Sequence, residues 1–343
     1  MRFLSLFMPR RRFVGIASAS LLANPHSSAA TRTLNSIGRL TTPSEQYDLL
    51  ELKASAESFF ALLRLRRSQT EYVVARYGLD GALGWSFSLP PGFPAIAPTA
   101  DGGLLVLMRT LPLSPSNGVS KPVDKLRLAP DGSQLSVENG FVPAMPLSFT
   151  VCADTLIAYY TDGTVRSRDL TSNGTEVTRF QLHAEPISGF KPTVVTAALE
   201  RTGADRVTLV DHTSPRMVSI DVTSGSVQTH RIVGGAIEPS LSASQRFVEA
   251  QAHTGRGGKI ATPVIFAATA GSESGRLFCL ASPINPEKTR ILEVTAGGDV
   301  VGVNVCAIPA RSEAPDKAPM FIAVAHSTLA IGFPRGDIFT YPV

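Results

Sequence analysis

Short strand-like segments alternate with polar turns through most of this chain, and this repeat constrains the fold more than any other feature. The clearest unit covers residues 149–182, where four such segments are separated by tight turns that include Asp162-Gly163 and Asn173-Gly174. Asp-Gly and Asn-Gly between alternating strands are the strongest local signal for a β-hairpin, because the turn needs positive φ at both central residues. The unit therefore predicts a four-stranded antiparallel sheet.

Similar units recur along the chain at a spacing of roughly 40–60 residues, which is typical of the four-stranded blades of a β-propeller. They cover residues 59–89, 104–137, 149–182, 193–232, 247–294 and 300–341. We therefore predict an all-β protein with a single β-propeller over residues 59–343, and the spacing fits six blades better than seven. A β-sandwich or two small β-domains is the alternative arrangement of the same strands.

Three short stretches resemble repeats of the quinoprotein-like, YVTN-type β-propellers. The stretches are residues 80–85, which match D-G-x-x-x-W, residues 101–106, which are similar to D-G-x-L-Y-V, and residues 217–225, which are similar to x-x-A-L-D-x-x-T-G. The chain has a single tryptophan, Trp85, so it lacks the regular tryptophan docking of those blades. The resemblance implies the propeller fold at the level of the superfamily.

Composition limits what else the chain contains. A propeller of about 270–290 residues would occupy most of the 343 residues, so a second globular domain is not expected. The formal net charge of +4 arises from residues 1–30, which hold four arginines and no acid, and the rest of the chain has 28 basic and 28 acidic residues. We therefore predict no nucleic-acid partner, since no basic surface remains to bind phosphates.

The first 30 residues have the form of an export leader. Three arginines at 10–12 followed by Phe13 resemble the twin-arginine export motif, an apolar segment covers 13–23, and small residues occupy 28–30. This order of charged, apolar and small residues predicts a signal peptide over 1–30, and a periplasmic or extracellular protein. The apolar segment is too short to cross a hydrocarbon core of ~30 Å, so no permanent membrane span is expected. An organelle transit peptide and a disordered cytosolic tail are the alternatives.

Residues 31–58 form a linker between the leader and the repeats. Residues 42–45 have the form of a capping box with proline at the first helical position, which predicts a short helix through Leu52. The alternative makes 48–53 a strand that closes the ring together with C-terminal strands.

A search for catalytic motifs assigns no catalytic, cofactor-binding or metal-binding residue. Residues 271–275 have the spacing of a serine-hydrolase elbow, but Glu273 occupies the place of the serine, so a hairpin loop is the better interpretation. Ser188 and Lys191 have the spacing of a Ser–Lys pair, but Gly189 and a following proline place them in a loop. The glycine-rich segment 255–259 lacks the pattern of a phosphate loop.

The remaining titratable residues give no metal signature. The six histidines are scattered without the spacing of ligand pairs along one strand or helix. Asp101, Asp162, Asp211 and His212 lie at loop ends that could line a central channel, but turn formation explains each of them better. Cys152, Cys279 and Cys306 lie in apolar segments without a CxxC pair, which predicts buried thiols, with one disulfide as the alternative.

These observations favour a non-catalytic binding or scaffolding protein that uses one face of the ring. The expected partner is a protein, a peptide or a glycan. The alternative is a propeller enzyme, such as a quinone-dependent dehydrogenase, a lactonase or a lyase, with its site in the central channel. A ring that packs as a structural subunit of a larger assembly is a third class. Three or more charged groups or histidines that face the channel would favour the enzyme.

Overall fold

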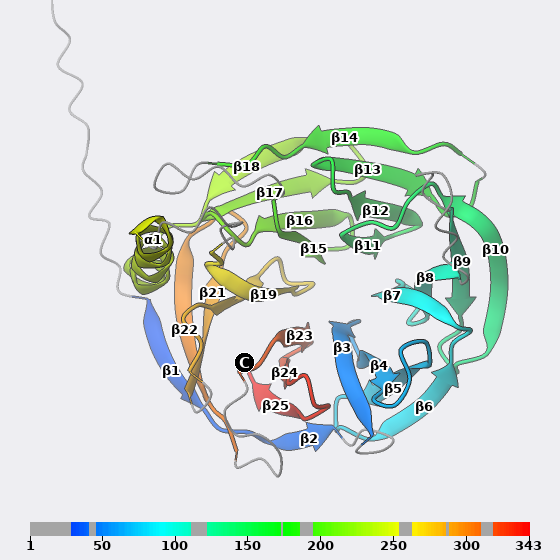
Figure 1. Ribbon diagram of the computed structural model, residues 1–343, viewed down its shortest axis with the longest axis horizontal. Coiled ribbons are helices and arrows are strands. Elements are labelled where there is room, and N and C mark those ends of the chain that lie inside the picture. The colour runs from blue at the N-terminus through cyan, green and yellow to red at the C-terminus, as the bar shows by residue number, and fades with distance from the viewer. Residues whose placement is uncertain are drawn as a thin grey trace, which may run out of the picture.

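The computed structural model describes residues 29–40, 46–110, 122–172, 174–185, 195–253, 263–285, 288–309 and 318–343. In these ranges the strands form six sheets arranged as blades around a central channel (Figure 1). The predicted six-bladed β-propeller is therefore confirmed, and the β-sandwich alternative is excluded. The predicted signal peptide lies outside the described residues, apart from its last two positions.

The first four blades each consist of four consecutive antiparallel strands. Blade 1 contains β3 (Tyr47–Ala54), β4 (Ser58–Leu65), β5 (Tyr72–Gly78) and β6 (Leu83–Ser88). Blade 2 contains β7 (Gly92–Pro98), β8 (Leu104–Thr110), β9 (Val123–Leu128) and β10 (Gln134–Val142). Blade 3 contains β11 (Ser148–Cys152), β12 (Thr155–Tyr159), β13 (Thr164–Asp169) and β14 (Val177–Gln181). Blade 4 contains β15 (Ala197–Arg201), β16 (Arg206–Asp211), β17 (Arg216–Asp221) and β18 (Val227–Arg231).

The last two blades combine strands from both ends of the chain. Blade 5 contains β19 (Phe266–Gly271), β20 (Leu277–Ala281), β21 (Lys288–Val294) and β22 (Val300–Ala307), and β1 (Ala30–Leu34) is added parallel to β22. Blade 6 contains β23 (Phe321–Ala325), β24 (Thr328–Gly332) and β25 (Ile338–Pro342), and β2 (Gly38–Leu40) pairs antiparallel with β25 as its outermost strand.

Strand β2 closes the ring because it joins an N-terminal segment to the last blade. Arg39 on β2 forms an ion pair with Asp337, and Leu40 is buried among residues of blades 1 and 6. The sequence interpretation placed a helix over residues 42–52 or a closing strand over 48–53. Residues 47–53 belong to strand β3, which is the inner strand of blade 1, and the closing strand lies earlier in the chain.

The core of the protein lies between neighbouring blades. Between blades 1 and 2, Phe60 and Leu62 of β4 pack in one cluster with Val106 and Leu126 of the next sheet. Because the sheets stack face to face, their middle strands are apolar on both faces, as the fully buried pattern of β20 shows. The partial alternation of the sequence is explained by this packing.

The Asp162-Gly163 hairpin forms as predicted, but only the glycine has a positive φ, so this turn is not the predicted type with positive φ at both central residues. At the β12–β13 turn, Asp162 accepts hydrogen bonds from the backbone N–H and the hydroxyl of Thr164 at 2.9 and 2.6 Å. Gly163 has φ 82°, and a Cβ there would lie 2.6 Å from the carbonyl oxygen of Leu182. Only glycine fits this turn without strain.

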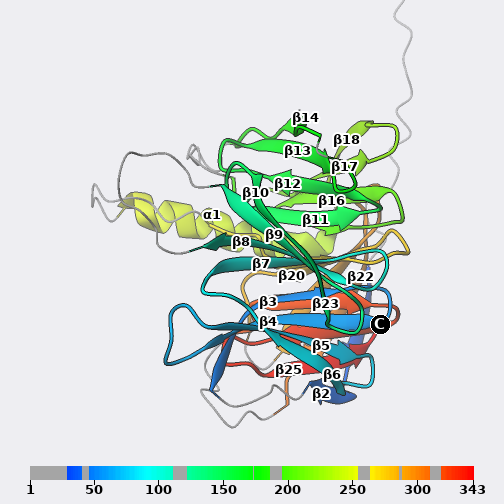
Figure 2. The same ribbon diagram turned by 90° about the vertical axis from the view of Figure 1, so that its right-hand side faces the viewer.

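Two features differ from the predicted units. The 16-residue helix α1 (Glu238–His253) follows the short 3₁₀ helix η1 (Gly235–Ile237), and α1 lies outside the ring beside blade 5 (Figures 1 and 2). A predicted β unit began inside this helix, at residue 247, although Pro239 in its first turn is a helix-start signal. The last predicted unit began at Val300, but β22 belongs to blade 5, since β2 supplies the fourth strand of blade 6. Among the described residues, no helix is long and apolar enough to cross a membrane.

Candidate functional site: the central channel

The channel is surrounded by the inner strand of each blade: β3, β7, β11, β15, β19 and β23 (Figure 1). At one end, a cavity of about 270 Å³ is lined by residues of these six strands, by residues just before β11, β15 and β23, and by His212; we call it the wide mouth. A constriction with a cavity of about 40 Å³ follows. At the other end, a cavity of about 140 Å³ is lined by the ends of β3, β15, β19 and β23 and by adjoining turns; we call it the narrow mouth.

Most of the wall of the wide mouth is apolar, and its titratable groups come from three places in the fold. Alanine and larger apolar side chains of all six blades face the cavity. Among the titratable residues, Glu51 and Lys53 come from β3, Glu200 from β15, and His212 from the turn after β16. Four titratable groups from two non-adjacent blades therefore share one small cavity with apolar walls.

Glu200 is the best-paired of these groups. The Lys53 Nζ lies 3.7 Å from its Oε1, and the hydroxyl of Thr269 on β19 donates a hydrogen bond to the same oxygen at 3.1 Å. The side chain of Glu200 is 9% exposed. Burial raises the pKa of Glu200, while Lys53 and the hydrogen bond from Thr269 act in the opposite direction. Glu200 thus links blades 1, 4 and 5 across the channel.

The carboxylate of Glu51 has fewer stabilising partners than that of Glu200. Its Oε2 accepts a hydrogen bond of 2.8 Å from the backbone N–H of Ile96 on β7. Burial raises the pKa of Glu51 to about 7, and the charge of Lys53 and the bond from Ile96 offset this effect only in part. The neighbouring charge of Glu200 raises the pKa further. Glu51 therefore changes its protonation state near neutral pH.

His212 is fixed by its backbone, whereas its ring is not fully paired. Its N–H donates to the carbonyl oxygen of Thr196 at 2.8 Å, and its carbonyl oxygen accepts from Ile265 at 2.7 Å. His212 is 9% exposed, and its Nε2 has no hydrogen-bond partner in the described part of the chain. Burial lowers the pKa of His212 to about 4, so the imidazole is neutral at physiological pH.

The preceding residue, Asp211, holds the turn that carries His212. Asp211 is 1% exposed and accepts hydrogen bonds from both the backbone and the hydroxyl of Thr213 and of Ser214, at 2.7–3.2 Å. Its Oδ2 also lies 2.9 Å from Arg216. Asp211 does not line the cavity, so its role is to fix the backbone on which His212 lies.

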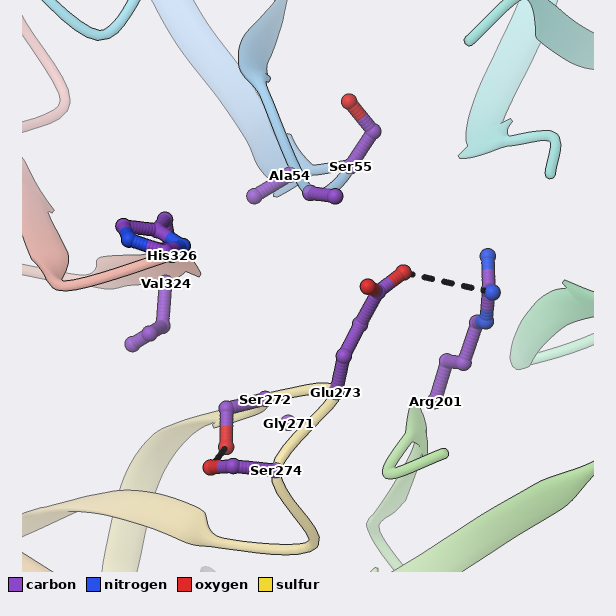
Figure 3. Close-up of a pocket in the computed structure, with 10 residues that line it drawn as sticks. Ala54, Ser55, Arg201, Gly271, Ser272, Glu273, Ser274, Val324 and His326 are labelled. Atoms are coloured by element: carbon purple, nitrogen blue, oxygen red, sulfur yellow. Dashed lines mark hydrogen bonds and ion pairs between the residues drawn. The ribbon is translucent and has the colours of Figure 1, made fainter. Parts of the chain in front are cut away.

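The narrow mouth has a different character. Glu273 in the β19–β20 turn pairs with Arg201 at 3.2 Å, and the hydroxyls of Ser272 and Ser274 lie 2.8 Å apart (Figure 3). His326 lines the same opening from the β23–β24 turn, with a left-handed φ of 50°. The Glu273 side chain is 51% exposed, so this ion pair is in contact with solvent.

Of the loop-end residues considered from the sequence, only His212 lines the channel. Asp101 lies in the β7–β8 turn, where it accepts a hydrogen bond from Thr99 and pairs with Arg127 at 2.7 Å. Asp162 has the turn role described above. Residues 271–275 form the predicted hairpin loop. Ser188, Lys191 and the glycine-rich segment 255–259 lie outside the described residues.

Sequence reasoning missed Glu51, Lys53 and Glu200. The available signal was a charged residue inside an otherwise apolar strand, as for Glu51 and Lys53 two positions apart on β3. Positions two apart point to the same face of a strand. Two charged residues on one face of a strand indicate a channel lining only if that strand is the inner strand of a blade, and the sequence alone did not place β3 there.

The described residues include three thiols and several histidines, but these do not cluster into a metal site. Cys152, Cys279 and Cys306 are all buried and unbonded, as thiols. No three histidine, cysteine or acidic side chains in the described ranges lie close enough together to hold an ion. What the channel offers instead is a small apolar cavity with one compensated acid, one poorly compensated acid and a neutral imidazole.

No protein-family model and no curated protein matches the chain. Solved structures with a similar fold include U3-55K, with 14% identity and a TM-score of 0.51 over 90% of this chain and 98% of that chain. Virginiamycin B lyase from Staphylococcus aureus has 10% identity and a TM-score of 0.48 over 89% and 98%. BamB from Moraxella catarrhalis has 12% identity and a TM-score of 0.46 over 90% and 100%. At this level of identity, the likeness to U3-55K shows a shared β-propeller fold and nothing more specific.

Proposed function

We propose that the protein is a binding propeller that receives its partner at the wide mouth. The supporting observation is a set of exposed apolar side chains where the inner strands begin. Leu147 and Met320 line the cavity and are 47% and 55% exposed. Phe93 and Val264 lie near the starts of β7 and β19 and are 41% and 38% exposed.

Exposed apolar groups around a cavity are typical of a surface that a partner covers. The narrow mouth carries an exposed ion pair and serines instead, which are well solvated without a partner. The contrast supports the wide mouth as the binding face. A protein or peptide partner fits it better than a glycan, because apolar rim residues offer few hydrogen bonds to sugar hydroxyls.

Site-specific photo-crosslinking in the source cells tests this proposal. A benzoylphenylalanine at Leu147 or Met320 is expected to form a covalent adduct with a partner, and one at Val177 on the outer strand β14 is the matched control. Val177 is 50% exposed, so its accessibility is similar. Adducts that form equally at all three positions, or only at Val177, would contradict the proposal.

We also propose that the chain is exported, on the basis of the arginines and apolar segment of residues 1–30. Residues 1–44 fused to a folded fluorescent protein should carry it to the bacterial periplasm. Arg10→Lys combined with Arg11→Lys should abolish this transport. Fluorescence that stays in the cytosol with the unaltered segment would contradict bacterial export, and import into an organelle of a eukaryotic host would support the transit-peptide alternative.

Acid–base catalysis in the same channel is the second candidate function. A carboxyl group with a pKa of about 7 is suited to transfer protons at neutral pH, and Lys53 and His212 share its cavity. Turnover of a lactone, a glycan or a quinone-linked alcohol that is lost in Glu51→Gln would favour it. Turnover that is unchanged in this variant would exclude Glu51 as the acid or base.

A further inference from the structure

The charged side chains that line the channel form pairs, with one exception. In the described residues, the three channel cavities are lined by Glu51, Lys53, Glu200, Arg201 and Glu273. Lys53 pairs with Glu200, and Arg201 pairs with Glu273. Within the described ranges, Glu51 has no ion pair and receives one hydrogen bond, from the backbone of Ile96. The lining therefore carries an excess of one negative charge when Glu51 is ionised.

His212 supplies an independent observation in the same cavity. Its side chain is more than nine-tenths buried, and its Nε2 lacks a hydrogen-bond partner in the described part of the chain. A buried polar atom without a partner costs free energy, so the ring of His212 is a second polar group of this cavity whose hydrogen bonding the described residues leave incomplete. The turn is rigid because Asp211 and the backbone bonds of His212 hold it.

The apolar wall and rim limit the kind of cation that fits. Leu50, Ile96 and Phe149 line the cavity together with Glu51, and Leu147 and Met320 extend this apolar surface to the rim. Lysine and arginine side chains have an apolar stem and a charged end, and they bury the stem along such walls. A cavity of about 270 Å³ has room for one such side chain rather than for a folded domain.

We propose that the wide mouth binds an extended segment of a partner protein and takes up one lysine or arginine side chain of that segment, whose cationic end pairs with Glu51. Apolar residues on either side of the basic residue would contact Leu147 and Met320. This inference rests on the proposed binding function and specifies the chemistry that the face recognises.

Binding of a cation is expected to favour the ionised form of Glu51. The titratable groups that share the cavity with Glu51 are Lys53 on β3, Glu200 on β15 and His212, and the described lining residues of β7, β11, β19 and β23 carry no charge. Because Glu51 titrates near pH 7, binding should release a proton, and affinity should fall about tenfold from pH 8 to pH 6.

Isothermal titration calorimetry of the folded chain with capped pentapeptides tests the proposal. The probes have leucine at both ends, alanine beside them, and lysine, arginine or norleucine in the centre. Wild-type protein at pH 8 should bind the lysine or arginine peptide at least tenfold more tightly than the norleucine peptide. Glu51→Gln should abolish this difference, and Glu273→Gln at the narrow mouth, the matched control, should leave it unchanged.

Other outcomes would overturn the inference. Equal affinity for the three peptides, or no binding of any of them, would show that the wide mouth does not select a cation. Binding of n-butylammonium as tight as that of the lysine peptide would show that a small amine, not a protein segment, is the ligand. The proposed function is tested separately, since crosslinks confined to Leu147 and Met320 would still identify the wide mouth as the binding face.

Discussion

Asp211 and His212 are neighbours in the sequence, yet their side chains differ in hydrogen bonding and in position relative to the channel. Asp211 is fully buried and accepts hydrogen bonds from Thr213, Ser214 and Arg216. His212 faces the wide mouth and keeps a ring nitrogen without a partner in the described ranges. Glu51, in the same cavity, receives one backbone hydrogen bond.

The difference separates two uses of a polar group inside a protein. A buried group with all its partners fixes the local backbone, and removing it leaves those partners unsatisfied. A group at a cavity that has few partners contributes little to the fold and is available to a ligand. Asp211 thus belongs to the scaffold, whereas Glu51 and His212 belong to the site. Four measurements examine this division.

The largest effect is expected for Asp211→Ala. The substitution leaves Arg216 and the Thr213–Ser214 turn without their common acceptor, so the free energy of unfolding should fall by about 3–5 kcal/mol. Urea denaturation of the purified domain measures this change. Asp131→Ala is the control, since Asp131 makes similar turn hydrogen bonds to Ser133 on the exposed surface and should matter much less. Similar losses in both variants would contradict the scaffold role.

Glu51→Gln should instead stabilise the protein at alkaline pH. A carboxyl group whose pKa rises from 4.5 in the unfolded chain to about 7 in the fold binds more protons when folded, so its contribution to stability falls as pH rises between these values. The variant should therefore be more stable than wild type by roughly 1–3 kcal/mol at pH 8 and nearly equal at pH 4.5. Denaturation at both pH values measures this, and a variant less stable at pH 8 would assign Glu51 to the scaffold.

His212→Gln should show the opposite pH dependence with a smaller effect. The pKa of His212 falls from 6.5 to about 4 on folding, so the folded chain binds fewer protons and its contribution to stability rises between pH 4 and pH 6.5. This rise should be missing in the variant. Relative to wild type, the free energy of unfolding of the variant should therefore be higher at pH 5 than at pH 7 by roughly 1–2 kcal/mol. Thermal unfolding at pH 5 and pH 7 compares them. An unchanged pH profile would contradict a buried neutral imidazole.

The smallest effect is expected for Glu273→Gln at the narrow mouth. The Arg201–Glu273 pair is exposed and screened by salt, so its loss should change the free energy of unfolding by about 0–1 kcal/mol. Denaturation in low and high salt should show a small difference from wild type that shrinks further as the salt concentration rises. A large loss would mean that the narrow mouth, too, holds the ring together.

The fold was predictable where turn chemistry is local. Asp162-Gly163 and Asp221 to Gly225 fix hairpins in blades 3 and 4, and the predicted strands there agree with the structure. The units at the two ends were misplaced, because β2 pairs with β25 almost 300 residues later and no local signal indicates this partner. Helix α1 was missed for another reason, since its sequence was interpreted as part of a repeat.

The site was less predictable than the fold. Glu51 and Glu200 lie about 150 positions apart in the chain, and they share a cavity only because both occupy inner strands of the ring. His212 was recognised as a loop-end residue, but its position depends on backbone hydrogen bonds to Thr196 and Ile265, which no local sequence pattern indicates. Spacing within one segment cannot reveal a site that six segments assemble.

The closing strand β2 also determines when this protein can finish folding. Arg39 and Asp337 are 298 positions apart, so the last blade gains its fourth strand only after nearly the whole chain is available. Contacts of such long sequence separation slow folding, because the chain loses the entropy of closing a long loop before strand pairing stabilises it. During synthesis, blades 1 to 4 can form in order, but β2 stays without its partner until β25, near the C-terminal end of the given sequence, has been made. A ribosome-bound chain would therefore expose an open ring with unpaired strand edges, which chaperones or another copy of the chain can bind.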